Sequence, residues 1–305
     1  MPSVDDVRRK LLNKPMQSPL DDLRRRLPDD FHRQLLDAAL QSLGEDNPLR
    51  VTNFSTGFRE LTRHVLASLA PDKDVAACSW YEVPKNTPSK FTRDQRISYI
   101  LHGGLTPEYA TDALGLDLDA ERKPLLQAIN WLSKNVHVNP ENFAPGPELA
   151  SKADETVTTL LDLLVAADHA RMALANHLEG HITEEIDMEV LTETLAALDE
   201  LSTHSSVDEV YVDSIKVLSV DSVEIRFLAK GSLGVGLQFG SNSDVRNDQG
   251  AVLEESFDFT CGLTSSVDEP EALSVIEDSL QVDTRDWRDN YFGADEREEP
   301  PPPES

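Results

Sequence analysis

Apolar residues recur along the first two thirds of the chain at steps of three and four, the spacing of one face of an α-helix. The first run, Leu20 to Leu36, is interrupted by Pro28 and therefore predicts two helices. The next run predicts a helix from about Thr52 to Ala70, on which Arg59 and Arg63 share one face. The chain thus begins with helices that pack through apolar stripes.

Further helices follow the same pattern. Thr92 predicts the N-cap of a helix from Arg93 to His102, which Gly103-Gly104 ends in the αL manner. Another helix is predicted from about Leu118 to Lys134, with Pro124 near its first turn, where proline is tolerated.

Two more helices are predicted before the pattern changes. A long one runs from Ser151 to about Leu178, because Gly180 indicates a helix end, and another covers about Met188 to Leu201. From Ser205 the apolar period becomes two, which is typical of strands.

The strand-like segments predict an antiparallel sheet of four or five strands in a meander. Val210 to Val217 begins the sheet, and Val223 to Phe239 reads as a hairpin with a turn at Lys230-Gly231. Ser256 to Leu263 continues the sheet.

Helices followed by a small sheet indicate an α+β fold. We predict a helical N-terminal region, then a small antiparallel β-meander domain and a disordered acidic C-terminal tail. The boundaries are a flexible arm at 1–16, a helical domain at 17–204, an antiparallel β domain at 205–268, and an acidic, partly disordered tail at 269–305.

The net charge of −28 lies entirely in the second half of the chain. Residues 1–138 contain 19 of the 28 Lys and Arg residues and 19 of the 56 Asp and Glu residues, so residues 139–305 carry the whole excess. An acidic half repels phosphate unless a metal or a basic partner intervenes. Nucleic acid is therefore disfavoured as a ligand of that half, although acidic surfaces also serve solubility.

The composition indicates a cytoplasmic protein with no membrane contact. No apolar run approaches the roughly 20 residues that span a bilayer, and no apolar core follows Arg8-Arg9-Lys10 as it would in a signal peptide. Cys78 and Cys261 fit a reducing compartment, because their spacing suits neither a zinc ribbon nor a disulfide framework.

The loop from Gln238 to Gly250 is the first candidate site, because it follows the predicted hairpin and is dense in small and acidic residues. Its carboxylates are ligands that Mg²⁺ or Mn²⁺ would accept, although the spacing is not that of an EF-hand and a long polar turn has the same composition. The candidates are Gln238, Ser241 and Asp244 for catalysis, Asn242 for substrate binding and Asp244 for metal binding.

A nuclease site of the restriction-endonuclease type would place a carboxylate before one strand and Glu-x-Lys on the next. Asp221 precedes the strand at Val223 and is therefore a second candidate metal ligand. Gly236 stands where the glutamate would be and Gln238 where the lysine would be, which would weaken metal binding.

Three basic side chains of the helical region are also candidates. Arg93 and Arg96 lie at the start of a helix, where anions are favoured, so they are candidate substrate-binding residues; pairing with carboxylates of the same protein is the alternative. His137 follows a helix and is a candidate general acid–base; a helix-capping or core histidine is the alternative.

Several phrases along residues 50 to 262 are distinctive when they are taken together. They are Phe58-Arg59-Glu60-Leu61, Leu69-Ala70-Pro71-Asp72, Thr92 to Tyr99, Gly103-Gly104-Leu105, Asn135-Val136-His137-Val138, Val212-Asp213-Ser214 and Leu237 to Asp244. Their combination resembles the predicted nuclease family associated with prokaryotic PIWI (pPIWI) proteins. The resemblance implies a bacterial antiphage or plasmid-conflict setting.

Two functions follow as hypotheses. The first is a nuclease-like component of a defence system that hydrolyses phosphodiesters with help from Mg²⁺ or Mn²⁺. The second is a non-catalytic adaptor whose helical half binds a partner protein of the same defence operon. In the second case, the acidic half would mimic nucleic acid or keep the assembly in solution.

Overall fold

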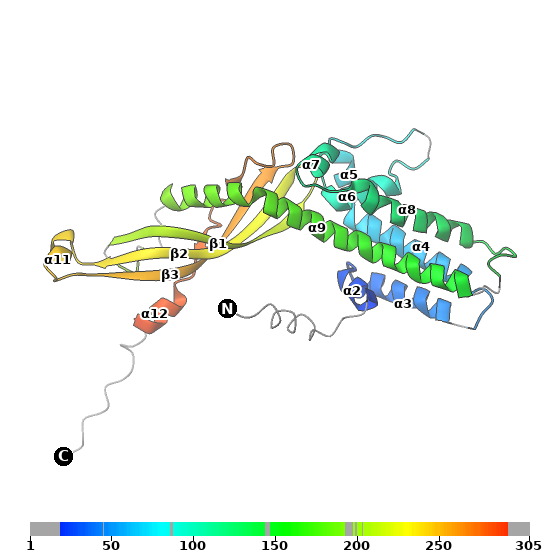
Figure 1. Ribbon diagram of the computed structural model, residues 1–305, viewed down its shortest axis with the longest axis horizontal. Coiled ribbons are helices and arrows are strands. Elements are labelled where there is room, and N and C mark those ends of the chain that lie inside the picture. The colour runs from blue at the N-terminus through cyan, green and yellow to red at the C-terminus, as the bar shows by residue number, and fades with distance from the viewer. Residues whose placement is uncertain are drawn as a thin grey trace, which may run out of the picture. The chain divides into compact units, whose positions relative to one another are not determined.

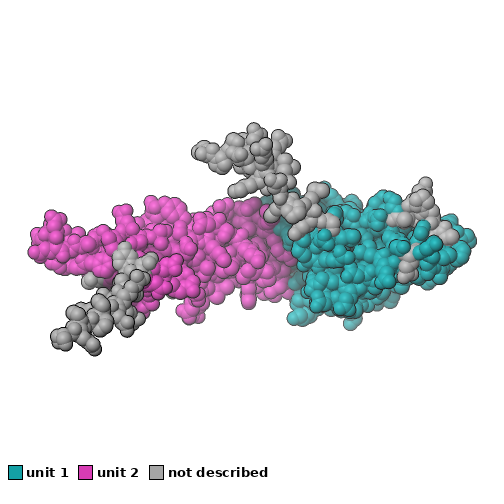
Figure 2. Space-filling model, turned by 90° about the horizontal axis from the view of Figure 1, so that it is seen from below, with its two compact units in different colours: residues 1–103, 107–170 teal, residues 104–106, 171–305 magenta. Residues whose placement is uncertain are grey.

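The computed structural model of the chain describes residues 19–291 except residues 45, 86–87, 144–146, 193–197, 199 and 203. The chain divides into two compact units, coloured separately in Figure 2. The helical unit comprises residues 1–103 and 107–170, and the sheet unit comprises residues 104–106 and 171–305. The flexible arm predicted for residues 1–16 lies outside the described residues.

The helical unit consists of successive helices (Figure 1), with a long connection between Ala77 and Arg93. They are α2 (Pro19–Arg26), α3 (Asp30–Gly44), α4 (Arg50–Leu69), α5 (Asp72–Ala77), α6 (Arg93–His102), α7 (Pro107–Asp112), α8 (Leu118–Asn135) and the first part of α9 (Pro147–Thr192). Pro28 lies between α2 and α3, so the predicted break is confirmed.

Helix α4 forms the centre of the helical unit. Phe54, Phe58, Leu61 and Val65 recur along one face, and none of them is exposed. This face packs against neighbouring helices, above all α3 and α8. Full burial of each such side chain contributes about 1.5–3 kcal/mol, so the apolar stripe read from the sequence is the main source of stability here.

Helix α6 begins and ends at the residues that the sequence predicted, but the predicted αL manner of its end is wrong. The Thr92 hydroxyl accepts a hydrogen bond from the Gln95 backbone N–H at 3.1 Å, and the Thr92 N–H donates to the Gln95 side chain at 2.9 Å. Gly103 ends the helix with a φ of 59°, but its ψ of −134° is not that of the αL conformation. Pro124 lies seventh in α8, inside the helix and beyond the first turn where the sequence placed it.

Helix α9 replaces the two helices predicted around Gly180. It runs unbroken from Pro147 to Thr192. The prediction of an end at Gly180 was wrong because an apolar row continues past it at steps of four. That row consists of Leu174, Leu178, Ile182, Ile186 and Val190, all buried. Packing of this row outweighs the roughly 1 kcal/mol by which one glycine weakens a helix.

Where the sheet unit is described, it contains five antiparallel strands, which confirms the predicted meander of four or five. They are β1 (His204–Val220), β2 (Glu224–Phe239), β3 (Ala251–Ser266), β4 (Ser274–Val275) and β5 (Gln281–Val282). The order is β1-β2-β3-β4, and β5 also pairs with β3. A short helix, α11 (Asn242–Arg246), lies in the β2–β3 connection, and α12 (Arg285–Tyr291) follows β5 (Figure 1).

The turn predicted at Lys230-Gly231 is wrong, because β2 continues through both residues and pairs with β1 and β3. The hairpin turn lies instead between β1 and β2. Gly231 is required for a close approach, since a Cβ there would lie 1.8 Å from the Tyr211 carbonyl oxygen. A glycine within a strand thus indicated crowding by a neighbouring backbone.

The second part of α9 belongs to the sheet unit and runs along the sheet (Figure 1). Inward residues of β2 such as Phe227 and Leu233 are fully buried, while alternate residues such as Lys230 are exposed. One face of the sheet is therefore apolar and covered, and the other face is polar.

The compact units divide at residue 170, whereas the sequence analysis placed a boundary at residue 204. Within the predicted tail at 269–305, β4, β5 and α12 are regular elements, and the Trp287 side chain is buried. Residues 292–305 lie outside the described part of the chain. Where the helices are described, none has the length and apolar character needed to cross a membrane.

Candidate functional site

The polar side chains of the acidic loop between β2 and β3 form hydrogen bonds with one another and with the loop backbone. The Asp244 carboxylate accepts hydrogen bonds from the Ser241 hydroxyl at 2.7 Å and from the Ser241 N–H at 2.8 Å, and Ser241 caps α11 in return. These bonds lower the pKa of Asp244, the hydroxyl contributing most. The Gln238 amide donates to the Gly240 carbonyl and to the Asn242 side chain at 3.0 and 3.1 Å.

The structure therefore brings Gln238, Ser241, Asn242 and Asp244 together, as the sequence predicted, but in bonds that shape a turn. One carboxylate oxygen of Asp244 receives both bonds from Ser241. This arrangement is the capping box of a short helix. The geometry by itself accounts for the residue types in the loop.

Asp221 does not join this loop. It lies in the β1–β2 turn, where its carboxylate accepts the N–H groups of Val223 and Glu224, each at 2.8 Å. Asp244 follows the opposite end of β2. The strand has 16 residues, which at about 3.3 Å each span roughly 50 Å. The two predicted metal ligands are therefore not placed to hold one ion.

His137 follows the end of α8 with an exposed side chain. Its backbone carbonyl accepts a hydrogen bond from the buried Asn142 side chain at 2.9 Å, which fixes the loop after α8. His137 lines neither the hollow between α4, α6 and α8 nor the one between α6, α7 and α8. Its predicted role in catalysis has no support from the geometry.

Four arginines line a hollow in the helical unit, which we name the arginine pocket. It lies between α4, α6 and α8 and has a volume of about 620 Å³. Arg59 and Arg63 of α4 and Arg93 and Arg96 of α6 line it. Two of these four are the substrate-binding candidates from the sequence.

The four arginines differ in how their charges are balanced. Arg63 and Arg59 share Glu60, at 2.8 and 3.6 Å. Arg96 pairs with Asp72, donates to the Ala70 carbonyl and lies 5.6 Å from the centre of the Phe91 ring. Arg96 therefore pairs within the protein, with Asp72, and its role in substrate binding stays a prediction.

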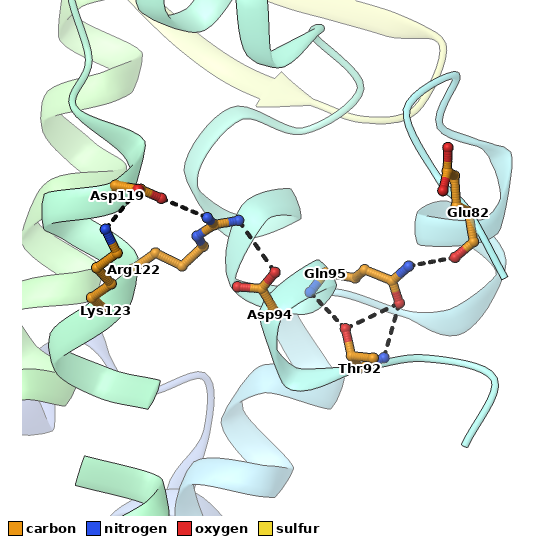
Figure 3. A network of polar contacts seen from close by, with 7 residues as sticks. All are labelled: Glu82, Thr92, Asp94, Gln95, Asp119, Arg122 and Lys123. Atoms are coloured by element: carbon orange, nitrogen blue, oxygen red, sulfur yellow. Dashed lines mark hydrogen bonds and ion pairs between the residues drawn. The ribbon is translucent and has the colours of Figure 1, made fainter. Parts of the chain in front are cut away.

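Arg93 makes no hydrogen bond and no ion pair within the described residues. Its neighbour Asp94 is directed to Arg122 of α8 at 3.2 Å, and Arg122 also binds Asp119 at 2.6 Å (Figure 3). Partial burial and, next, the guanidinium of Arg59 lower the pKa of Arg93 from its usual value, while Glu60 acts in the opposite direction. An anion in the pocket would relieve this repulsion.

A second hollow, of about 670 Å³, lies on the sheet unit. Asp213, Lys230, Asp258, Asp283 and Arg285 line it together with uncharged residues. Hydrogen bonds from Arg285, its side chain first, lower the pKa of Asp283 to about 2. Three carboxylates against two cations make this hollow unfavourable for phosphate.

The sequence reasoning missed two members of the arginine pocket. The sequence placed Arg59 and Arg63 on one face of a helix. It could not show that they lie near Arg93, because this depends on the packing of α4 against α6. Lys230 was also missed, because its strand was interpreted as a turn. Within the described residues, no group of three or more His, Cys, Asp or Glu side chains is placed to hold a metal ion.

Comparison with known families gives two matches. A family model described as predicted pPIWI-associating nuclease matches residues 24–162, and a second with the same description matches residues 167–288. The two matches divide close to residue 170, where the compact units also divide. No curated protein and no solved structure matches the chain.

Proposed function

Because the chain belongs to the family of predicted pPIWI-associating nucleases, we propose that it is a nuclease-like component of a prokaryotic antiphage and plasmid defence system. The resemblance seen in short sequence phrases is confirmed at the level of the family. One observation carries the proposal beyond the family: the arginine pocket gathers four guanidinium groups with too few carboxylates. A protein that acts on nucleic acid must hold phosphate, and this pocket is suited to it.

Arg93 and Arg96 have different roles in the proposed binding of phosphate. A guanidinium donates two parallel hydrogen bonds to phosphate oxygens, which fixes both position and orientation. Arg93 is exposed and has no partner among the described residues, so its donors are available to a ligand. Arg96 is held by Asp72, Ala70 and Phe91 and therefore presents a fixed positive charge.

We further propose that cleavage is metal-assisted and uses Mg²⁺ or Mn²⁺. An all-protein metal centre does not fit the described residues, since they contain no suitable cluster of ligands. Mg²⁺ commonly binds through one or two carboxylates together with substrate phosphates and waters, and that is the arrangement proposed here. When bound, such an ion would stabilise charge on the phosphate and activate water.

Binding is the first test of the proposal. The purified full chain is titrated with labelled single- and double-stranded DNA and RNA in a chelator. We expect Arg93→Gln to weaken binding about 10- to 100-fold and to reduce the dependence on salt, because one phosphate contact is lost. Arg25→Gln is the matched control: it removes one exposed charge of the same unit, whose pair with Asp22 contributes little. Equal affinity in wild type and Arg93→Gln would contradict the proposal.

Cleavage is the second test, and it decides the role of Asp244. The same nucleic acids are incubated with Mg²⁺ or Mn²⁺, and products are resolved on a gel. Ser241→Ala removes the hydroxyl that caps α11 but leaves the Asp244 carboxylate in place, whereas Asp244→Ala removes the carboxylate that completes the capping box and leaves the hydroxyl. If Asp244 takes part in the reaction, only Asp244→Ala stops cleavage; if it serves the turn, the two variants behave alike. Absence of cleavage by wild type, with its partner protein present, would favour the adaptor.

Partner and location belong to the proposal as well. The family description names pPIWI association, which supports a partner protein of the same defence operon and a cytoplasmic place of action. Purification of the tagged chain from cells that also produce the pPIWI protein should recover the two together. Recovery of the chain alone at physiological salt would count against the partner.

A further inference from the structure

We propose that the arginine pocket receives the end of a nucleic-acid strand and binds its terminal phosphate monoester. This inference rests on the proposed function and names the part of the substrate that the pocket holds. It differs from binding along the middle of a strand, where each phosphate is a diester.

The shape of the site is the first argument. Proteins that follow a nucleic-acid backbone use a long basic groove. The arginine pocket is instead a hollow of about 620 Å³ bounded by three helices, within the range of sites for small ligands. A hollow of this size suits one nucleotide at the end of a chain.

The charge of the site is the second argument. Glu60 and Asp72 balance two of the four arginines, and Asp94 is engaged by Arg122. About two positive charges remain for a ligand. A terminal phosphate carries about −1.5 to −2 at pH 7, whereas each backbone diester carries −1. The monoester therefore matches the surplus charge with a single group.

The apolar wall of the pocket is the third argument. Leu66, Phe91, Leu126 and Ile129 line it beside the arginines. The Phe91 ring stacks on Tyr81 with centroids 5.4 Å apart and also lies beneath the Arg96 guanidinium. Such a wall adds little to the binding of a bare phosphate ion but covers the sugar or base that accompanies a terminal phosphate.

The test compares strand ends on the full chain. Internally labelled single strands of DNA and of RNA carry a 5′-phosphate, a 3′-phosphate or hydroxyls at both ends, and binding is followed by anisotropy in a chelator. We expect one phosphorylated end to bind at least about tenfold tighter than the hydroxyl strand. The two phosphate arms show which end is recognised.

Variants locate the effect. Arg93→Gln and Arg59→Gln should remove the difference between phosphate and hydroxyl ends, whereas Arg25→Gln should keep it. Arg93 is exposed and makes no hydrogen bond or ion pair within the described residues, so its substitution should leave the fold intact. Equal binding of all three strands would overturn the inference while the proposed function stands. Binding of none of them would overturn both, and a preference that survives both pocket variants would place the terminal phosphate elsewhere.

Discussion

The two compact units differ in how their arginine side chains are paired with carboxylates. In the helical unit, four arginines line one pocket, and Arg93 has no partner among the described residues. In the sheet unit, carboxylates are in excess, and the guanidinium groups of Arg226, Arg285 and Arg288 are each bound by one. The first unit can therefore accept an anion at Arg93 without rearranging its ion pairs, whereas these three guanidinium groups of the second unit would first have to leave their carboxylates.

The two units show that the density of polar groups and the pairing of those groups are separate properties. The loop from Gln238 to Gly250 is dense in polar residues, yet its Asp244 is bound by Ser241. The arginine pocket is far less conspicuous in the sequence, because α4 and α6 supply its charges from separate segments. Its unbalanced charge appears only after folding.

The largest expected effect concerns the crowded backbone of the sheet unit. Gly231→Ala should destabilise the protein by more than about 3 kcal/mol, because the new Cβ would lie 1.8 Å from the Tyr211 carbonyl oxygen and β1 would have to move. Gly234→Ala, in the same strand, meets only Glu209 at 3.5 Å and is the control. Denaturant unfolding measures both; similar stabilities would show that β1 moves freely.

The second effect concerns the reactivity of the buried Cys261 thiol. Burial, reinforced by Glu189 and Glu185, raises the pKa of Cys261 to about 11, although a hydrogen bond with Ser279 acts against this. At pH 8, an ordinary thiol would be ionised roughly 100-fold more. In a Cys78→Ser variant, alkylation of Cys261 should be correspondingly slow.

The pH dependence of the alkylation rate tests whether the pKa of Cys261 is raised. Because the folded thiol keeps its proton until about pH 11, the alkylation rate should rise about tenfold per pH unit from pH 8 to pH 10. An ordinary thiol would level off near pH 9, and the urea-unfolded variant should show that behaviour. A plateau near pH 9 in the folded variant would contradict the raised pKa.

The third effect compares two capping boxes of the same design. Thr92→Ala should cost about 1 kcal/mol, because α6 carries buried residues that include Ile97 and Ile100. Ser241→Ala should leave the stability of the whole protein nearly unchanged, since α11 buries no residue. Thermal unfolding measures both variants. Equal losses would show that the loop after β2 contributes to the fold as much as α6 does.

Local patterns predicted the helical unit well and the sheet unit less well. Thr92, Pro28 and the apolar row of α4 act on their own neighbourhood, so the sequence alone was enough to place these helices. Strand length depends on partners: β2 could not be recognised as 16 residues because Gly231 is explained only by the Tyr211 backbone beside it. The arginine pocket likewise depends on tertiary packing, because separate helices supply its side chains. The sequence therefore indicated only Arg93 and Arg96 as candidate binding residues.

The smallest effect tests how helices of the two units accommodate glycine. Gly180 of α9 is exposed, and a Cβ there would meet nothing within 4 Å. Gly180→Ala should therefore stabilise the sheet unit by about 0.5–1 kcal/mol, through the lower entropy of the unfolded chain. Gly57 of α4 is the counterpart in the helical unit, where a Cβ would lie 3.2 Å from the Ala39 Cβ.

Gly57→Ala should gain less than Gly180→Ala or lose stability, because α3 and α4 would have to separate slightly to admit the methyl group. Thermal unfolding of the two variants, side by side with wild type, measures the difference, and the gain for Gly180→Ala corresponds to an increase in Tm of roughly 1–4 °C. A larger gain for Gly57→Ala would mean that the α3–α4 contact is looser than its geometry indicates. A loss of stability in Gly180→Ala would mean that α9 needs a flexible residue where its apolar row passes Gly180. The difference between the two units would then arise from α9.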